Sequence, residues 1–342
     1  MDRGVVLSEP GRVALEEIDV AEPGPGEVLV RIEATGVCHS DLHVIEEDGW
    51  GHRLPVLLGH EGAGVVEAMG EGVDGIAPGE RVVIGWKTAC GTCPQCARGR
   101  PRHCRTPPAA AGRLRRADGA VLTPVLRTGT FATRTVVPAV AVVPIPRELP
   151  VEQACLLGCA VATGVMSALE TAHVEEGARV AVIGCGAVGL SVIQGARIAG
   201  AGEIRAFDLD ERKLEQARRQ GAADGEPGDR VDVAFDVVGR RETFELALSL
   251  LASGGTAVLV GLSPAGERAE VDLPRLFARR AHIIVSHGGD HLPDDFPRLA
   301  RWALDGTLDL ASMVTRVAPL DEWEQALDAM RDGRTVRTVL TP

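Results

Sequence analysis

Residues 1–150 carry short apolar runs that are separated by turns. Val28-Leu-Val-Arg-Ile32, Gly64-Val-Val-Glu67 and Arg81-Val-Val-Ile84 are rich in valine and isoleucine, and regular helical spacing is scarce around them. Runs of β-branched residues bounded by glycine and proline are typical of strands. The pattern therefore predicts a β-rich region that ends near Pro150.

After about residue 160 the pattern of apolar positions changes. Arg179-Val-Ala-Val-Ile183 is a continuous apolar strand, as expected in a parallel sheet that is covered on both faces. Strands that alternate with helices indicate a doubly wound α/β domain. Further elements are predicted as strands at Glu203–Phe207, Val231–Phe235 and Thr256–Val260, a helix near Glu242–Ala252, a helix at Asp321–Arg331 and a final strand at Val336–Leu340.

Composition excludes some classes of partner. The chain has 342 residues, and 36 basic against 48 acidic residues give a net charge of −12. This balance argues against nucleic acid or an anionic membrane, because both reward basic patches. A hydrophobic content of 45% is enough for two domains, each with its own hydrophobic core. We expect no transmembrane helix and no signal peptide, so eight cysteines indicate metal binding in a reducing cytoplasm.

Four cysteines form one compact motif. Cys90, Cys93, Cys96 and Cys104 follow the spacing C-x2-C-x2-C-x7-C. Four thiolates on one short loop match tetrahedral Zn²⁺ and leave no position for water or substrate. The motif therefore predicts a closed, structural zinc site, which performs no chemistry itself.

A glycine-rich turn follows the strand at 179–183. Gly184, Gly186 and Gly189 form a G-x-G-x-x-G motif that opens a predicted helix, which is the context expected of a dinucleotide site. The first glycine permits the tight turn, and the second lets a pyrophosphate approach the helix N-terminus. The third lets helix and strand pack closely.

Asp208 ends the next predicted strand, 19 residues after Gly189. A carboxylate there can accept hydrogen bonds from the adenosine ribose and would repel a 2′-phosphate, so it favours NAD over NADP. Lys213 is a second candidate contact with the cofactor, and with Arg212 it leaves NADP as an alternative. Asp208 could also be a solvated acid at a strand end, as Asp210 could be.

Three other potential metal ligands lie outside the loop. Cys38, His60 and Cys159 would leave a fourth zinc position open for water or substrate, as in a catalytic site. Their spacing alone does not bring them together. A lone buried cysteine is more often a small core residue, which is the interpretation we favour for Cys155 and Cys185.

The whole chain resembles the zinc-dependent medium-chain alcohol dehydrogenases. The resemblance implies a GroES-like β-rich catalytic domain at residues 1–160, completed by residues 287–342, and a Rossmann NAD-binding domain at residues 161–286. It also implies a homodimer or homotetramer. The matching segments occur in the family's order: Gly36-Val-Cys-His-Ser-Asp-Leu-His43, Leu58-Gly-His-Glu-Gly-Ala-Gly64, the four-cysteine loop, Gly158-Cys159, Gly184–Gly189 with Asp208, and Val336-Arg-Thr-Val-Leu340.

The resemblance assigns roles to residues around a catalytic zinc. Glu61 matches a carboxylate that approaches the metal during ligand exchange, and Asp41 matches the acid that orients the ligand histidine. Ser40 and His43 match a proton relay to solvent. Without the resemblance, Ser40 would be a turn hydroxyl and His43 a surface histidine. The implied zinc ligands are Cys38, His60 and Cys159.

Further roles concern the cofactor and the substrate. His39 and Arg337 match positions that face the pyrophosphate, and Thr163 matches a residue near the nicotinamide. His287 falls beside the expected cofactor site, where a surface loop is the simpler interpretation. The residues that resemble a substrate pocket are Trp50, Trp86, Phe131 and Leu262, for each of which ordinary core packing is an equal alternative.

The resemblance implies an enzyme with two zinc ions per chain that interconverts a primary or secondary alcohol, possibly bulky or aromatic, and its aldehyde or ketone by hydride transfer with NAD. Alternatives are a dehydrogenase of thiol–formaldehyde adducts (mycothiol- or glutathione-type), a reductase of iminium or conjugated C=C bonds, and a non-catalytic NAD-binding zinc protein. The two tryptophans argue against the first, since a thiol carrier needs a cationic or polar pocket. Ser40 and His43 argue against the others.

The segment 222–231 is shorter than in many relatives and is expected to be a loop.

Overall fold

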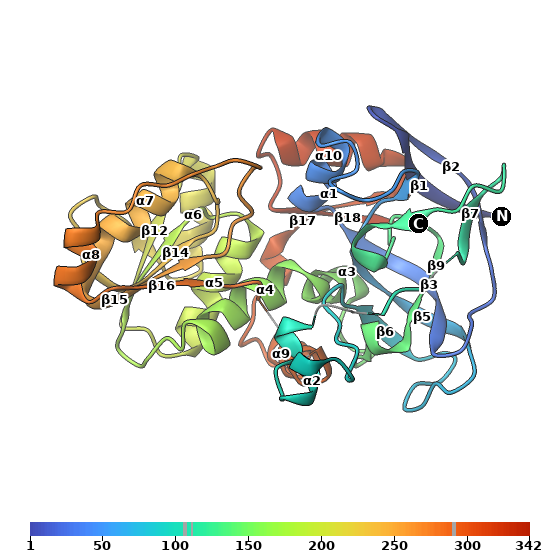
Figure 1. Cartoon of the computed structure of the whole chain (residues 1–342), viewed down its shortest axis with the longest axis horizontal. Coiled ribbons are helices and arrows are strands. Elements are labelled where there is room, and N and C mark those ends of the chain that lie inside the picture. The colour runs from blue at the N-terminus through green and yellow to red at the C-terminus, as the bar shows by residue number, and fades with distance from the viewer. Residues whose placement is uncertain (105–107, 111, 289–291) are drawn as a thin grey trace. The chain divides into compact units, whose positions relative to one another are not determined.

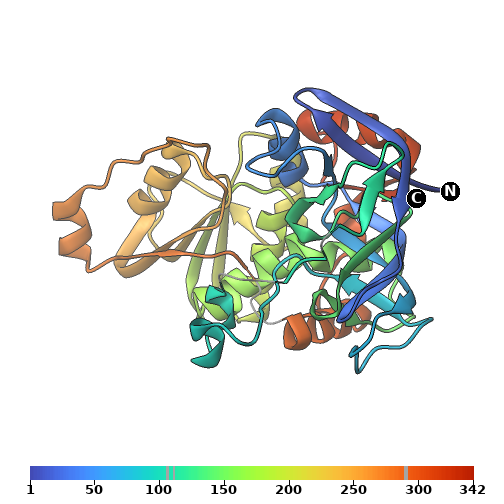
Figure 2. The ribbon, with the colours of Figure 1, turned by 45° about the vertical axis from the view of Figure 1, so that its right-hand side comes forward.

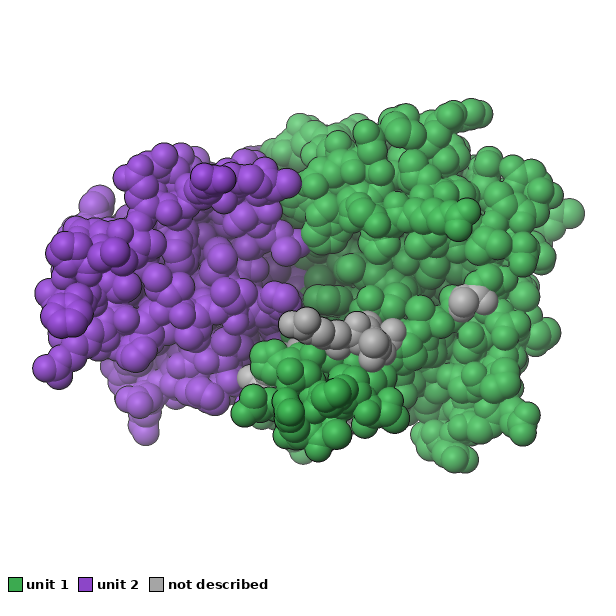
Figure 3. Space-filling model, viewed as in Figure 1, with its two compact units in different colours: residues 1–159, 290–342 green, residues 160–289 purple. Residues whose placement is uncertain are grey.

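The chain divides into two compact units. The computed structural model describes residues 1–104, 108–110, 112–288 and 292–342. Unit 1 contains Met1–Cys159 and Asp290–Pro342, and unit 2 contains Ala160–Gly289; Figure 3 colours them separately. The domains predicted from the sequence are residues 1–160 with 287–342, and residues 161–286.

Unit 1 is built around two β-sheets (Figures 1 and 2). Among the described residues, one sheet has five strands in the order β7-β2-β1-β4-β8, and the other has seven, in the order β10-β6-β5-β3-β18-β17 with β9 paired to β3. The three apolar runs predicted as strands lie in β3, β5 and β6. The first sheet contains β1 (Asp2–Glu9), β2 (Arg12–Val20), β4 (Val56–Leu57), β7 (Leu114–Arg116) and β8 (Thr123–Pro124). The second contains β3 (Glu27–Gly36), β5 (Glu61–Met69), β6 (Arg81–Ile84), β9 (Arg134–Pro138), β10 (Val142–Pro144), β17 (Val314–Pro319) and β18 (Arg337–Thr341).

Short helices connect and cover these strands. The helix predicted at 321–331 and the final strand predicted at 336–340 are confirmed as α10 and β18, with small shifts at their ends. The α-helices of unit 1 are α1 (His39–Glu46), α2 (Pro94–Ala97), α3 (Val151–Ala154), α9 (Leu292–Leu304) and α10 (Trp323–Arg331). Its single-turn helices are η1 (Pro101–His103), η2 (Val125–Arg127), η3 (Ala139–Ala141), η4 (Cys155–Gly158), η6 (Ala311–Met313) and η7 (Leu320–Glu322).

Unit 2 is a parallel sheet with helices on both faces (Figures 1 and 2). In the part of the chain that the structure describes, six strands follow the order β13-β12-β11-β14-β15-β16, and every pair is parallel. This confirms the doubly wound α/β prediction. The strands are β11 (Arg179–Ile183), β12 (Glu203–Phe207), β13 (Ala223–Asp224), β14 (Val231–Asp236), β15 (Leu251–Leu259) and β16 (His282–Val285). The helices are α4 (Ala160–Met166), η5 (Ser167–Thr171), α5 (Ala187–Ile198), α6 (Glu211–Arg219), α7 (Arg241–Leu250) and α8 (Leu273–Arg279).

One prediction for unit 2 was wrong. The segment 222–231 is not only a loop, because its first residues form the short strand β13. Ala223 and Asp224 pair in parallel with Arg205 and Ala206 of β12. Two exposed residues carry no alternating apolar pattern, so this edge strand left no sequence signal.

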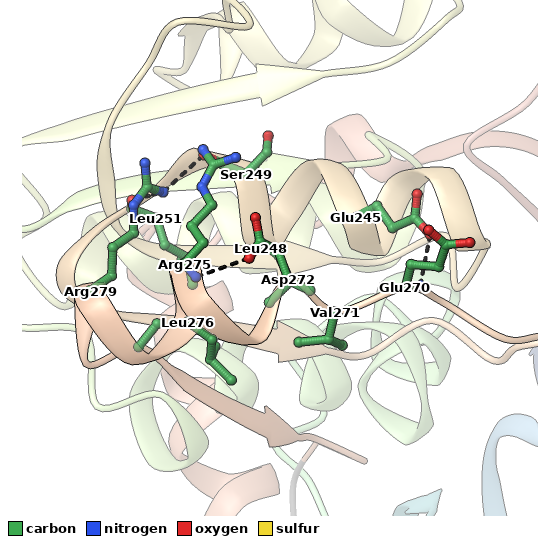
Figure 4. Close-up of a pocket in the computed structure, with 11 residues that line it drawn as sticks. Glu245, Leu248, Ser249, Leu251, Glu270, Val271, Asp272, Arg275, Leu276 and Arg279 are labelled. Carbon is green, nitrogen blue, oxygen red and sulfur yellow. Dashed lines mark hydrogen bonds between the residues drawn. The ribbon is translucent and has the colours of Figure 1, made fainter.

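A small pocket separates α7 and α8 in unit 2 (Figure 4). Arg275 and Arg279 extend from α8, and both donate to the carbonyl oxygen of Ser249 near the end of α7, at 2.9 and 3.1 Å. Arg279 also donates to the carbonyl oxygen of Leu251. Basic side chains at a helix C-terminus satisfy carbonyls that lack partners within the helix. These bonds hold α8 against the end of α7.

Membrane-spanning potential is limited to one helix pair. No single helix among the described residues is long and apolar enough to cross a membrane. Val151–Gly158 and Ala160–Thr171 meet the criteria of length and composition only when they are taken together, and the pair is bent at its break.

Candidate active site

Strand pairing brings Cys38 and His60 together. β3 and β5 run antiparallel, with Gly36 opposite Glu61. Cys38 lies two residues beyond the end of β3, and His60 immediately precedes β5. The antiparallel pairing therefore places both side chains at the same end of the two strands.

Cys159 reaches the same place at the end of η4. A Cβ on the preceding residue, Gly158, would lie 2.6 Å from the carbonyl oxygen of Ile84, so a larger residue would displace this segment. The ligand atoms of four buried residues consequently lie within 4.8 Å of one another: Cys38, His60, Glu61 and Cys159. We call this group the dispersed cluster.

Asp41 orients the histidine of the dispersed cluster. Its Oδ1 lies 3.2 Å from Nδ1 of His60 and accepts from the backbone N–H of Gly59 at 3.1 Å. Its Oδ2 accepts from the backbone N–H of Cys38. This arrangement assigns the proton of His60 to Nδ1 and leaves a lone pair on Nε2. Nε2 is buried and has no hydrogen-bond partner among the described residues. A buried nitrogen without a partner is energetically costly, and a metal ion at this position would remove that cost.

The thiols of the dispersed cluster favour a bound cation. A hydrogen bond from Cys159 lowers the pKa of Cys38 well below its usual range, against the effect of burial, and the charges of Arg337 and His60 add to this. A thiolate is the form that binds metal. The same hydrogen bond and burial raise the pKa of Cys159 well above its usual range, so Cys38 is the thiolate of this pair before a metal binds. The cluster has the donor types that zinc requires, with two sulfurs, one nitrogen and a nearby carboxylate.

Glu61 and Arg337 form a buried ion pair beside these ligands. Nη2 and Nε of Arg337 donate to the two carboxylate oxygens of Glu61 at 3.0 and 3.2 Å, and Nη2 lies 3.6 Å from Sγ of Cys38. Burial raises the pKa of Glu61 to about 7, although the guanidinium opposes the shift. A Cβ at Gly36 would lie 2.2 Å from Glu61 Oε2, so this glycine makes room for the carboxylate.

The sequence analysis missed the Glu61–Arg337 pair. These residues are 276 positions apart, and no local pattern connects them. β18 pairs with β3, placing Val339 opposite Gly36, and this pairing brings Arg337 to the cluster. Contact between Arg337 and a pyrophosphate stays a prediction, since the structure shows its guanidinium bound to Glu61.

The proposed proton relay lies on α1. Oγ of Ser40 is 3.9 Å from Sγ of Cys38, next to the dispersed cluster. His43 is partly exposed, its Nδ1 lies 3.1 Å from Oε1 of Glu47, and its ring stacks on Trp50 with centroids 5.9 Å apart. Within the described residues no direct hydrogen bond joins Ser40 to His43. The relay therefore needs a further group between them, such as the cofactor ribose that the resemblance implies.

The four-cysteine loop forms a separate, partly exposed cluster, which we call the loop cluster. Sγ of Cys93 lies 3.5 Å from that of Cys96 and 4.0 Å from that of Cys104, and the four sulfurs lie within 4.8 Å of one another. Backbone N–H groups of Cys90 and Cys93 donate to sulfurs of the loop. Four thiolates supply every tetrahedral position, so the arrangement fits a closed zinc site.

The glycine motif of unit 2 leaves space for a ligand. Gly184 has φ +94° between β11 and α5, and a Cβ at Gly189 would lie 1.9 Å from the carbonyl oxygen of Gly184. A Cβ at Gly186 would meet nothing within 4 Å, so the backbone is open at the helix N-terminus. This is the geometry in which a pyrophosphate is bound.

Asp208 fixes the glycine loop. Its Oδ2 accepts from the backbone N–H of Cys185 at 2.7 Å, and its Oδ1 accepts from the backbone N–H of Asp210 at 2.9 Å. Each oxygen keeps a lone pair for a ribose hydroxyl. Arg212 donates to Asp210 at 2.7 Å and is therefore already engaged, whereas Lys213 is partly buried on α6.

Comparison with known proteins agrees with this geometry. The family model of the alcohol dehydrogenase GroES-like domain matches residues 24–147, and that of the zinc-binding dehydrogenase matches residues 224–305. An S-(hydroxymethyl)glutathione dehydrogenase of Photobacterium damsela subsp. piscicida is 36% identical over 364 residues, with 99% of both chains covered. The chain belongs to the zinc-dependent medium-chain alcohol dehydrogenases.

Solved structures of this dehydrogenase family share the whole architecture. An alcohol dehydrogenase zinc-binding domain protein from Burkholderia ambifaria has a TM-score of 0.93 and 32% identity, covering 99% of this chain and 98% of that one. Benzyl alcohol dehydrogenase from Acinetobacter calcoaceticus has a TM-score of 0.91 and 28% identity, covering 100% and 99%. These likenesses confirm the GroES-like and Rossmann assignments.

Three of the residues predicted to line the dehydrogenase's substrate pocket belong to unit 1, and the fourth belongs to unit 2. The side chain of Phe131 is fully buried in the core of unit 1, as the alternative of ordinary core packing expects, and a Cβ at Gly59 would lie 2.3 Å from its backbone nitrogen. Its place beside a substrate stays a prediction. Trp50 is partly buried against the same core, and Trp86 is partly exposed. Leu262, in unit 2, is half exposed.

Residues predicted near the cofactor lie in both units. His39 and His287 are exposed. Thr163 lies beneath the loop that follows β16, because a Cβ at Gly288 would be 2.1 Å from its Cα. The hydroxyl of Ser286 in this loop lies 2.7 Å from that of Ser167. The predicted contacts of these residues with NAD stay predictions.

Proposed function

We propose that this protein is an NAD-dependent zinc alcohol dehydrogenase, which interconverts a primary or secondary alcohol and its aldehyde or ketone. The observation that carries the proposal is the dispersed cluster, in which the buried Nε2 of His60 has no hydrogen-bond partner in the described part of the chain and lies beside two thiols. When bound, zinc supplies a Lewis acid that lowers the pKa of an alcohol, and NAD⁺ supplies the hydride acceptor.

The chain's own residues prepare this chemistry. Asp41 keeps the proton of His60 on Nδ1, so that Nε2 remains available to the metal. Cys38, His60 and Cys159 leave one tetrahedral position open for the substrate oxygen. Ser40 Oγ, beside Cys38, takes up the alcohol proton while its own hydroxyl proton moves on toward His43, across the gap that a further group must bridge. His43, which is partly exposed, releases a proton to water.

NAD is the proposed cofactor because of Asp208. Its carboxylate lies where the adenosine ribose of a bound dinucleotide is expected, and it would repel a 2′-phosphate. The engagement of Arg212 with Asp210 supports the preference, because a free arginine there would favour NADP. Initial rates with NAD⁺ and NADP⁺ at equal concentration test it.

A second candidate is oxidation of a thiol–formaldehyde adduct. The relative from Photobacterium damsela subsp. piscicida carries the name S-(hydroxymethyl)glutathione dehydrogenase, and the two chains match over nearly their full length. The two tryptophans in the sequence argued against the adduct, whereas this similarity favours it.

A substrate panel separates these candidates. Zinc-loaded protein is mixed with NAD⁺ and either aliphatic alcohols, aromatic alcohols or formaldehyde with glutathione, and NADH is followed by absorbance. Turnover with any of them supports an enzyme of this family. No turnover with the whole panel, by protein that contains both zinc ions, would contradict the proposal.

Self-association is a further part of the proposal. Unit 2 exposes apolar side chains on α8 and on the edge strand β16, including Phe277 at 87% and Val285 at 60%. Apolar residues exposed along an unpaired strand edge are typical of an interface. We propose a homodimer or homotetramer, and sedimentation of wild type against Phe277→Asp tests it.

We also propose that the protein acts in a reducing cytoplasm. All eight cysteines lie in the described residues and none of them forms a disulfide, and six of them lie in the two clusters. Thiolates in metal sites require reducing conditions. Fractionation of cells that produce the protein tests the location.

A further inference from the structure

Ser286 is the centre of a group of hydroxyls in unit 2. It directly follows β16, and its Oγ lies 2.7 Å from Oγ of Ser167 and 2.9 Å from Oγ1 of Thr171. The backbone N–H of Gly288 donates to the same oxygen at 3.1 Å. Ser286 and Ser167 are buried, with 3% and 0% of their surface exposed. We call Ser286, Ser167 and Thr171 the hydroxyl cluster.

The direction of these hydrogen bonds follows from the number of protons. Ser167 uses its only hydroxyl proton on the carbonyl oxygen of Thr163, at 2.6 Å. The proton between Ser167 and Ser286 therefore comes from Ser286. The two lone pairs of Ser286 accept from the hydroxyl of Thr171 and from the N–H of Gly288. One donor and two acceptors are the full capacity of a serine hydroxyl, so Ser286 is saturated by bonds within unit 2.

The hydroxyl cluster holds the loop after β16 against α4. Gly288 is buried with φ +80°, and a Cβ there would lie 2.1 Å from Cα of Thr163, so the two backbones are in contact. Ser167 and Thr171 lie in η5, a single π-helical turn, and such turns are frequent at functional sites. The loop is thus fixed at Ser286 and Gly288, whereas His287 between them is exposed.

Strand order places this loop at one end of the predicted cofactor site. Ligands of doubly wound sheets bind along the carboxyl ends of the strands. The glycine turn ends β11, Asp208 follows β12 on one side of it, and β14, β15 and β16 lie on the other side. With the adenosine ribose at Asp208 and the pyrophosphate at the glycine turn, the nicotinamide half of a dinucleotide extends over the ends of β14 to β16.

We propose that Ser286 is a positioning residue, which holds the loop 286–288 in the conformation that accepts the nicotinamide half of the cofactor. It acts on the loop and not on the reacting atoms. Because the hydroxyl cluster orders the loop before the cofactor arrives, binding does not have to order it, and affinity is strengthened. The proposal rests on the proposed NAD-dependent function and adds a residue outside the sites predicted from the sequence.

Stabilisation of unit 2 alone is the competing explanation. Without the hydroxyl of Ser286, the buried N–H of Gly288 would have no other acceptor among the residues that the structure describes, which is costly. A purely structural role would therefore lower the stability of the unit and would treat all ligands of the glycine turn alike. A positioning role would instead affect only ligands that contain the nicotinamide.

Two ligands that differ in the nicotinamide separate these explanations. NADH contains it, whereas ADP-ribose has the adenosine, the pyrophosphate and the second ribose without it. Binding of each to zinc-loaded, full-length protein is measured by isothermal titration calorimetry. Ser286→Ala removes the centre of the cluster, and Thr171→Val replaces one hydroxyl by a methyl group. Ser191→Ala is the matched control, because its buried hydroxyl donates to the carbonyl oxygen of Ala187 within α5.

We expect Ser286→Ala to raise the Kd of NADH about 5- to 20-fold, as loss of one or two hydrogen bonds does. The Kd of ADP-ribose should change less than about twofold. Thr171→Val should weaken NADH binding by a smaller factor, and Ser191→Ala should change neither ligand. Equal weakening of both ligands, or unchanged NADH binding in Ser286→Ala, would overturn the proposal. If Ser286→Ala does not fold, Thr171→Val decides, and the absence of a loss confined to NADH contradicts the proposal.

This binding test is independent of turnover. Wild-type protein that binds NADH but oxidises nothing in the substrate panel would reject the proposed function, and the comparison with ADP-ribose would still test Ser286. Wild-type protein that binds ADP-ribose as tightly as NADH would overturn the positioning role, because the nicotinamide would then gain nothing from the loop. Wild-type protein that does not bind NADH would overturn both proposals.

Discussion

The two metal clusters of unit 1 are built in opposite ways. The loop cluster takes four thiols from residues 90–104, and all four are partly exposed. The dispersed cluster takes its ligands from the ends of β3, β5 and η4, and every one is buried. A local cluster can close around zinc without the rest of the fold, whereas a dispersed cluster exists only after the sheet has formed. The loop cluster, whose four thiols fill every tetrahedral position, fits a structural role. The dispersed cluster, which leaves one position open, fits catalysis.

Loss of a ligand from the dispersed cluster should have the largest effect. Cys38→Ser removes a thiolate and should lower kcat/KM by at least about 10³-fold, because the Lewis acid supplies several kcal/mol. The unfolding temperature should change little. Cys155→Ser is the matched control, since Cys155 is buried in the same unit but outside the cluster. Cys38→Ser with ordinary turnover would end the catalytic assignment.

Loss of a ligand from the loop cluster should act mainly on stability. Cys93→Ser should release the loop zinc and lower the free energy of unfolding by a few kcal/mol, since metal binding stabilises the folded state. Activity per folded molecule should fall far less than in Cys38→Ser. Thermal unfolding with and without added zinc checks this. If Cys93→Ser abolishes turnover without changing stability, the assignment of a structural role to the loop cluster is contradicted.

Substitution of Asp41 should have an effect of intermediate size on zinc affinity, and only the dispersed cluster should be affected. Asp41→Asn replaces the acceptor that orients His60, and changes of this kind lower metal affinity or activity about 10- to 100-fold. Competition with a zinc chelator measures the affinity of each cluster. We expect the dispersed cluster to release zinc earlier while the loop cluster is unchanged. Equal release from both would show that Asp41 acts on the fold.

The smallest effect concerns the cysteines outside both clusters. Burial raises the pKa of Cys185 to about 12, and burial also raises that of Cys155. Only about one Cys185 thiol in 10⁵ is a thiolate at pH 7, so alkylation should be slow and should rise with pH. Peptide mapping of zinc-free protein should show Cys93 modified first, because hydrogen bonds from the backbone and side chain of Cys96 lower its pKa, whereas the pKa of Cys96 is raised to about 12. Rapid modification of Cys185 at neutral pH would contradict its burial.

The sequence predicted best what depends on neighbouring residues. The loop cluster, β11 and the glycine turn after it all follow from short local patterns, and the structure contains each of them. The strand predicted at Arg179–Ile183 has the observed bounds. A local motif carries its own geometry, so it can be recognised without the fold.

Features that depend on strand pairing were not predictable from spacing. Cys38 and His60 meet because Gly36 pairs with Glu61, and Arg337 joins them because β18 pairs with β3. Resemblance to a family supplied the ligands but not the Glu61–Arg337 pair. It also placed Phe131 beside a substrate, which stays a prediction, and the structure shows that packing against Gly59 buries it in the core.

The central claim is that the dispersed cluster holds the catalytic zinc and the loop cluster a structural one. Zinc content and turnover, measured on the same preparations of wild type, Cys38→Ser and Cys93→Ser, test it most directly. We predict two zinc ions per chain in the wild type and one in each variant, matching the two clusters, with turnover lost only in Cys38→Ser. Two zinc ions in Cys38→Ser, or full turnover in a preparation that lacks the second zinc, would contradict the account.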